Sequence, residues 1–471
     1  MGPPGISWRW LAIAMLSLLP AGCIPALPLR HLSVQDPLYD SRPRLEFAGG
    51  SEATQTPDPP HERKEAVRGE PAALNELLDI AVKYHPDLTA ARARVEVARG
   101  RMIQAGLYPN PSIGPNFSQL GDMANRTGEM GARFTQTFPT GGKLRLAKEA
   151  GARGVEAADF QAITKWHEVL TRVRYAYFEL LTAQREQETL KDIVKVSDEA
   201  FEVFKKKEKQ GAGIRPDLLR AKVELEQNQV KLKISQRRVD AAAENLLTAL
   251  GRPPIALDHL KTTRKELDGT PPDYEWTAML ECLRETSAEL HEARALVAQQ
   301  EKLLARAKVE VCPNITIAAI PFYESFARET RVELIVQAPI PLFDRNQGNI
   351  HAAEADLTRS IAFRRQLELQ LTERLTNAFQ RYQSARHQTE AYERTIVKEA
   401  KESLKLVKAI YDLGGDAKYD YSSVLLAQQI LFQAQLAQTQ ALGEMWRSVV
   451  EIAGILQQDR LLNGCAVKER R

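Results

Sequence analysis

The feature that most constrains the fold of this 471-residue chain is an internal duplication, because its sequence plan recurs after about 203 residues. Four pairs of dipeptides keep nearly this offset: Pro109-Asn110 with Pro313-Asn314, Phe138-Pro139 with Ile340-Pro341, Gln210-Gly211 with Leu413-Gly414, and Leu250-Gly251 with Ala453-Gly454. We therefore expect two similar halves. They are placed at residues 74–251 and 276–456, separated by a Pro-rich linker at 252–275 and followed by a tail at 457–471.

The N-terminus has the pattern of an export signal. An apolar run, Leu11 to Leu19, follows one arginine and precedes small residues and Cys23. This pattern resembles a bacterial lipoprotein signal over residues 1–22, which would make Cys23 the lipidated first residue of the mature protein. Ordinary signal cleavage, with Cys23 unmodified, is the alternative. The Pro-rich, polar stretch at 23–73 is predicted to be an extended arm.

Each half contains a pair of long helices joined by a glycine turn. No proline occurs from Lys143 to about Gln210, and apolar residues recur there at helical spacing, which predicts a helix on the order of 100 Å long. Gly211 and Gly213 end it, and a return helix leads to Leu250. The second half repeats this with helices at 360–413 and 422–454 around Gly414 and Gly415. Residues 74–105 form a further, shorter helical pattern.

Four other segments alternate apolar and polar side chains with the period of a β-strand. They lie at about residues 111–120, 129–138, 313–323 and 330–340. Soluble hairpins that pack on helices are one interpretation. The other is membrane strands, whose usual length is about 9 to 11 residues. Four strands cannot close a barrel, for which about eight are needed, so closure would take two or more chains, and strand number alone does not choose between them.

Composition and motifs narrow the function classes. After the N-terminus no stretch is apolar for the roughly 20 residues of a membrane helix, and 64 basic against 61 acidic residues give no indication of nucleic acid as a partner. No Ser-hydrolase elbow, P-loop or dinucleotide fingerprint occurs, and the eight histidines are scattered. The predicted helix between Cys282 and Cys312 keeps those two apart, so no disulfide framework is indicated. We expect a protein that is not an enzyme and that needs neither cofactor nor metal centre.

The motifs as a whole resemble the TolC-type outer membrane efflux protein family over about residues 74–456. They are Tyr108-Pro109-Asn110-Pro111 before a strand, Phe138-Pro139-Thr140-Gly141-Gly142-Lys143 after one, and Tyr411-Asp412-Leu413-Gly414 with Val424-Leu425-Leu426-Ala427-Gln428 at the second turn. The resemblance implies a mainly α fold with a small membrane β part. It implies a homotrimer in which four strands from each chain form a 12-stranded barrel, continued by long coiled-coil hairpins across the periplasm. The Gly-Gly-Lys motif is most similar to the heavy-metal branch of the family, which handles cobalt, zinc and cadmium or copper and silver.

The resemblance also implies a function and a place for it. Such proteins are passive ducts of tripartite efflux systems, partnered by a periplasmic adaptor, an inner-membrane pump and outer membrane lipid. The hairpin tips would form the periplasmic entrance, where Tyr411 and Gly414 match the family pattern and Asp217 supplies one acidic position. The family's other acidic positions fall here on Ser423 and Leu426. The nearby residues Asp412, Asp416, Lys418 and Asp420 complete the predicted entrance, in which the aspartates would attract cations.

Several alternatives remain at this stage. The aspartates of the second tip could be solvated turn residues, and Lys205 to Lys207 are expected to be a solvated helix face. The exported substrate could be a drug or a protein instead of a metal, because the methionines form no cluster of the kind that copper handling would suggest. A periplasmic coiled-coil lipoprotein or adaptor is a further alternative, although an adaptor would need β-rich domains around a single hairpin and would not show the duplication.

Overall fold

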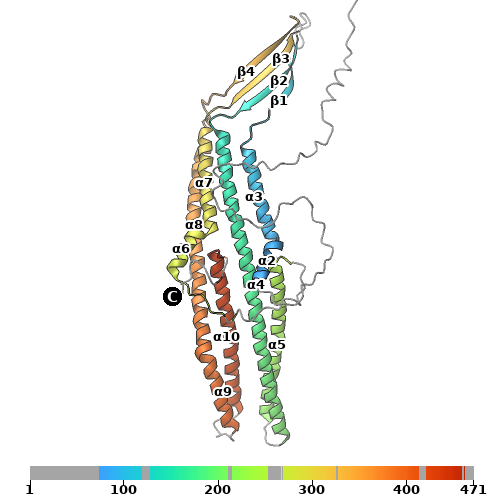
Figure 1. The fold of residues 1–471 in the computed structure, drawn as a ribbon, viewed down its shortest axis with the longest axis vertical. Helices are drawn as coiled ribbons and strands as arrows, with labels where there is room; N and C mark the ends of the chain where they lie inside the picture. The colour runs from blue at the N-terminus through green and yellow to red at the C-terminus, as the bar shows by residue number, and fades with distance from the viewer. Residues whose placement is uncertain are drawn as a thin grey trace, which may run out of the picture. The chain divides into compact units, whose positions relative to one another are not determined.

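The computed structural model describes residues 74–118, 128–210, 215–252, 267, 269–324, 327–412, 421–458 and 461. All of them belong to one compact unit, Lys64–Arg471. As expected, this unit is mostly helical and carries one four-stranded sheet (Figure 1). The predicted signal, Cys23 and the Pro-rich arm lie outside the described residues.

The first half contains α2 (Leu74–Tyr84), α3 (Pro86–Ala105), α4 (Lys143–Lys209) and α5 (Arg215–Ala249). The single helix expected over 74–105 is wrong, because two helices meet at His85. The ring of His85 accepts a hydrogen bond from the Asp87 amide at 3.2 Å, and Pro86, which has no N–H to lose, occupies the first helical position. A new helix therefore starts where the apolar spacing alone suggested continuity.

The second half contains α6 (Trp276–Thr286), α7 (Ala288–Val309), α8 (Gln347–Ala391), a π-turn at Tyr392–Ile396, α9 (Val397–Asp412) and α10 (Tyr421–Ile455). The predicted start of the long helix at residue 360 is wrong by more than three turns. Residues 347–359 are mostly polar, so they show no apolar stripe, yet α8 already packs against α7. The π-turn was not expected either, and nothing in the sequence pattern explains it.

The set of helices that pack side by side differs between the two ends of the unit. Near the sheet α3, α4, α7 and α8 are neighbours in that order, whereas farther from it the order is α5, α4, α10 and α9 (Figure 1). The long α4 takes part in both groups. At its start, Gly141 and Gly142 have φ of 65° and 71°, a left-handed backbone that favours glycine, and they turn the chain from β2 into the helix.

The sheet consists of β1 (Ser112–Ser118), β2 (Glu129–Phe138), β3 (Ile315–Glu324) and β4 (Glu329–Gln337). Its order is β1-β2-β3-β4 and every pairing is antiparallel, so the central β2–β3 pair joins the two halves of the chain. Both β1 and β4 are edge strands. Each therefore leaves one row of backbone N–H and C=O groups without a neighbouring strand among the described residues.

The register separates the two faces of the sheet by polarity. Residues that share one face are almost all apolar: Ile113, Pro115, Phe117, Met130, Ala132, Phe134, Phe138, Ile315, Ile317, Ala319, Pro321, Tyr323, Val332, Leu334 and Val336. Several are largely exposed, and Val332, Leu334 and Val336 are each more than 60% exposed. The other face carries most of the polar and charged side chains, among them Arg133, Arg331 and Glu333. An exposed apolar face opposite a polar one is what a lipid-facing strand requires.

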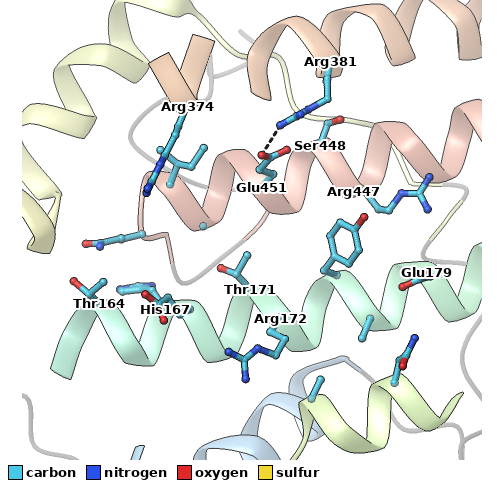
Figure 2. A pocket seen from close by; sticks show the side chains of 18 of the residues that line it. Thr164, His167, Thr171, Arg172, Glu179, Arg374, Arg381, Arg447, Ser448 and Glu451 are labelled. Atoms are coloured by element: carbon cyan, nitrogen blue, oxygen red, sulfur yellow. Dashed lines mark hydrogen bonds and ion pairs between the residues drawn. The ribbon is translucent and has the colours of Figure 1, made fainter. Parts of the chain in front are cut away.

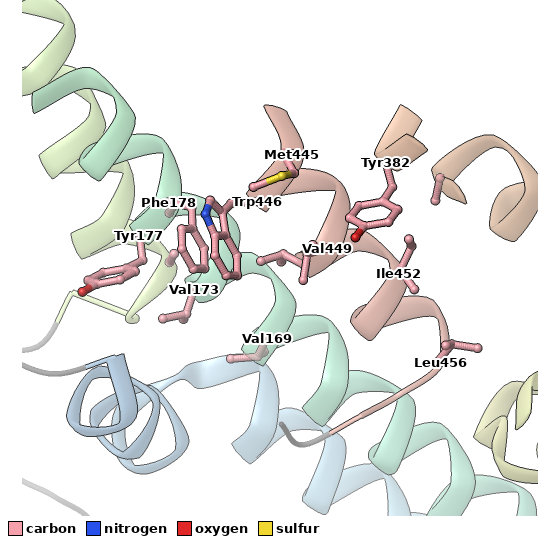
Figure 3. Packing of buried hydrophobic residues seen from close by; sticks show 14 of the residues in the cluster. Val169, Val173, Tyr177, Phe178, Tyr382, Met445, Trp446, Val449, Ile452 and Leu456 are labelled. Atoms are coloured by element: carbon pink, nitrogen blue, oxygen red, sulfur yellow. The ribbon is translucent and has the colours of Figure 1, made fainter. Parts of the chain in front are cut away.

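The main hydrophobic core lies where α4 and α10 meet α2, α6 and the end of the linker. Figure 3 shows Phe178 and Trp446 stacked there, with ring centroids 5.2 Å apart, and the Trp446 ring N–H donates to the Leu267 carbonyl at 2.9 Å. Tyr382 donates to the carbonyl of Pro272 in the same way. These bonds satisfy polar atoms of buried aromatic side chains and fix the linker against the helices.

The cysteines partly depart from expectation. Cys312 is a free, exposed thiol, so Cys282 and Cys312 do not pair, as predicted. Cys282, however, takes part in a disulfide, although the sequence indicated no disulfide framework. Cys282 is buried within α6.

Candidate functional site

The ends of four long helices meet at the tip farthest from the sheet. A small apolar cluster joins them, with Phe204 of α4, Ala221 of α5, and Val424 and Leu425 of α10 buried at its centre. Five partly buried residues surround it: Phe201, Leu218, Leu404, Val407 and Tyr411. The two hairpins, α4–α5 and α9–α10, therefore contact each other at their tips.

A direct contact between the hairpins involves Lys207 and Tyr411. The ammonium of Lys207, in the last turn of α4, lies 4.6 Å from the centroid of the Tyr411 ring and donates to its hydroxyl at 3.3 Å. It also lies 5.9 Å from the Phe204 ring. A cation over an aromatic ring is worth about 0.5–1 kcal/mol at an exposed site and more where water is excluded. The contact thus adds a polar link to the apolar cluster.

This contact corrects part of the expectation for the basic run. Lys205 does behave as a residue of a helix face, because its ammonium is 2.7 Å from Glu202 of the same helix. Lys207 instead points across to the second hairpin, and it is a functional candidate that sequence reasoning missed. Its partner is 204 residues away, and no local pattern could have indicated the pair.

The structure describes two predicted entrance residues in detail. Tyr411 contacts the first hairpin as described above. Asp217 lies in the first turn of α5, where the helix dipole favours a carboxylate, and its side chain is 3.9 Å from Arg220 of the same helix. Asp412 is the last residue of α9. The remaining predicted residues, Gly211, Gly213, Gly414, Gly415, Asp416, Lys418 and Asp420, lie outside the described residues.

A buried polar layer lies directly behind the tip cluster. Ser197 of α4, Glu224 and Asn228 of α5, and Gln428 of α10 are each at most 9% exposed, and the Asn228 amide donates to the Ser197 hydroxyl at 2.9 Å. Burial raises the pKa of the Glu224 carboxyl, against a smaller opposing effect of Lys231. A second apolar cluster, Leu190, Ile193 and Phe432, follows on the other side. The polar layer therefore separates the tip cluster from the rest of the helical unit.

The described part of the chain shows no group of three or more His, Cys, Asp or Glu residues placed to hold a metal ion. Among the helices described, none is both long enough and apolar enough to cross a membrane.

Comparisons with known proteins agree with this architecture. Residues 77–252 match the model of the family "Outer membrane efflux protein". The chain is 23% identical over 388 residues to the cobalt-zinc-cadmium resistance protein CzcC of Cupriavidus metallidurans, covering 82% of this chain and 90% of that protein.

Solved outer membrane proteins have the same fold. VceC of Vibrio cholerae superposes with a TM-score of 0.69 at 20% identity, covering 82% of this chain and 96% of its own. The outer membrane channel MtrE of Neisseria gonorrhoeae, in its open state, gives a TM-score of 0.68 at 17% identity, covering 82% and 89%.

The family match, the helical hairpins and the sheet with one exposed apolar face agree with one another. Residues 77–252 thus match the outer membrane efflux protein family, and the chain has the fold of solved outer membrane channels.

Proposed function

We propose that this protein is the homotrimeric outer membrane channel of a tripartite efflux system and that it exports metal cations. The two open sheet edges are the observation that carries the proposal. A four-stranded sheet with an exposed apolar face is stable in lipid only if its edge backbone groups are paired. Joining β1 of one chain to β4 of the next closes a barrel, and three chains supply the 12 strands of the family architecture.

The helices offer matching surfaces on the same two flanks of the chain. Four apolar side chains of α5 form an exposed stripe at helical spacing: Leu219, Val223, Val230 and Ile234. On the opposite flank, Ile396, Leu406 and Ile410 form another exposed stripe on and just before α9. Water-exposed stripes of this kind are unfavourable in a monomer. A head-to-tail ring would bury the α5 stripe of one chain against the α9 stripe of the next.

The same assembly gives a transport path. The apolar sheet face would contact lipid and the polar face would line the pore, so a solute could cross without entering hydrocarbon. The paired hairpin tips would close the periplasmic end until a periplasmic adaptor and an inner-membrane pump engage it. Each half, 74–251 and 276–456, would contribute one hairpin and two strands, and the ring of three chains would alternate first and second tips.

Two finer parts of the proposal concern the substrate and the anchor. The 23% identity to CzcC, whose name refers to cobalt, zinc and cadmium, supports metal cations as the substrate. Asp412, Asp416 and Asp420, repeated in three chains, would attract such cations at the entrance. Cys23 would carry lipid and hold the N-terminus at the outer membrane.

A deletion strain tests the proposed substrate. Loss of the gene is expected to lower the tolerated concentration of cobalt, zinc or cadmium salts, and the intact gene restores it. If the deletion strain is sensitive to drugs and its metal tolerance is unchanged, the substrate is a drug and not a metal cation.

Asp416→Asn combined with Asp420→Asn should reduce block of the reconstituted channel by divalent cations, and unchanged block would refute the cation-attracting ring. Labelling with radioactive palmitate, compared with Cys23→Ala, tests the lipid anchor.

A further inference from the structure

A trough that is lined largely by polar and charged residues runs along α10. It consists of three hollows of about 830, 460 and 410 Å³, and neighbouring hollows share residues such as Glu444, Arg381 and Gln388. α4 and α5 line one flank and α8 lines the other. Figure 2 shows the largest hollow, with Arg374 and Arg381 of α8 and Arg447 of α10 around it.

Most trough residues and core residues of α4 lie on opposite faces of that helix. On α4, Val173 and Tyr177 are buried in the core, whereas Thr171 and Tyr175 line the trough. Two residues along an α-helix correspond to a rotation of about 200°, so these pairs point in opposite directions. The core face of this wall is covered by α2 and α6, through Leu77 and Met279, and no described helix covers the trough face.

In the assembly proposed above, the position of the covering helices α2 and α6 determines which face of the helical wall lines the pore. A second layer of helices inside the ring would fill the passage. Outside the ring it obstructs nothing, so the covered face is the outer one and the trough faces the pore.

Two buried hydroxyl groups agree with a wet trough. Ser448 is 2% exposed, and its hydroxyl has no hydrogen-bond partner among the described residues. Thr164, which also lines the largest hollow, has a buried hydroxyl oxygen in the same condition. Buried hydroxyls without a protein partner usually bond to water, which a pore-facing trough supplies.

Three arginine–glutamate pairs lie among the residues that line the trough. Arg381 of α8 binds Glu451 of α10, and Arg447 reaches Glu444 of its own helix at 2.7 Å. Arg238 of α5 binds Glu186 of α4 at 2.8 Å. All six side chains are at least 14% exposed, so they border open space while neutralising one another.

We propose that this trough is the water-filled pore wall between the tips and the sheet, and that its three arginine–glutamate pairs keep the wall electrically balanced. Passing ions are then neither retained nor repelled at this level, and selection by charge takes place at the entrance. The inference rests on the proposed channel function. Rings of unpaired charge would select strongly between cations and anions, which paired charge avoids.

Charge-neutralising variants in planar bilayers test the balance. Arg381→Gln with Arg447→Gln leaves two uncompensated carboxylates in each chain, and the cation-to-anion permeability ratio is expected to rise by about twofold or more. Glu444→Gln with Glu451→Gln should lower the ratio. Removing both partners of one pair, Arg381→Gln with Glu451→Gln, should leave it unchanged. Equal ratios for all variants would overturn the proposal.

Cysteine modification tests which face lines the pore, with Cys312→Ser as the background. Ser384→Cys lies exposed in the trough and Thr277→Cys lies exposed on α6, on the covered side. A positively charged thiol reagent should reduce conductance of the first variant and leave the second unchanged. The opposite result refutes the placement of the trough while the channel function stands. Absence of any conductance from the intact protein would refute the channel function itself.

Discussion

Lys207 and Tyr411, which lie 204 residues apart in the chain, meet at the tips of two different helical hairpins, with the ammonium 4.6 Å from the ring centroid and 3.3 Å from the hydroxyl. Lys207→Met removes both interactions and should loosen the closed tip. The mean single-channel conductance of the reconstituted protein is expected to rise. Tyr411→Phe keeps the ring and should have a smaller effect. The adjacent, exposed Lys206→Met is the control, and a rise of equal size there would show that net charge is responsible.

Because the Glu224 carboxyl is buried, we expect the stability of the protein to depend on pH. Because burial raises its pKa in the folded state, the folded protein binds more protons than the unfolded chain between the ordinary pKa of glutamate and the raised value. Stability contributed by neutral Glu224 is therefore greatest in acid and is lost as pH rises through that window. Glu224→Gln should raise the melting temperature by about 2 °C at pH 7 and leave it unchanged at about pH 4. Thermal unfolding at both pH values, with the exposed Glu226→Gln as control, checks this. An equal gain at both pH values would contradict titration as its cause.

Two glycines let α10 approach α4 closely. A Cβ atom at Gly443 would lie 2.4 Å from the Thr182 methyl, and one at Gly454 would lie 2.5 Å from the Thr171 hydroxyl. Gly443→Ala should therefore destabilise the fold by about 1–3 kcal/mol. Thr182→Ala in the same chain should recover most of that loss, because it removes the two nearest atoms. Denaturant unfolding of the two single variants and the double variant measures the coupling, and additive effects would show that the helices do not meet there.

Adjacent residues of β4 distinguish a membrane sheet from a soluble one. Leu334 is 67% exposed on the apolar face, and Ile335 lies on the polar face. Leu334→Lys should impair membrane assembly by about 2–4 kcal/mol if the residue faces the bilayer centre, whereas Ile335→Lys should be tolerated. The amount of protein in the outer membrane fraction is the readout. Normal assembly of Leu334→Lys with loss of Ile335→Lys would reverse the assigned faces.

Much of the architecture was predictable because it follows local periodicity. Alternation from Met130 to Phe138 identified β2, and the proline-free run of helical spacing from Lys143 to about Gln210 identified α4. Features without a local signature were missed, namely the polar start of α8 at Gln347 and the π-turn at Tyr392–Ile396. The contact of Lys207 with Tyr411 could not be read from the sequence either, because its geometry depends on how two hairpins pack.

The number of chains in the purified protein tests the central claim most directly. Four strands with two open edges require neighbours, and the proposed channel closes with three copies. Native mass spectrometry of the detergent-extracted protein should give the mass of three mature chains, persisting until the protein is heated. A monomer, or an assembly of two or four chains, would contradict the proposed duct.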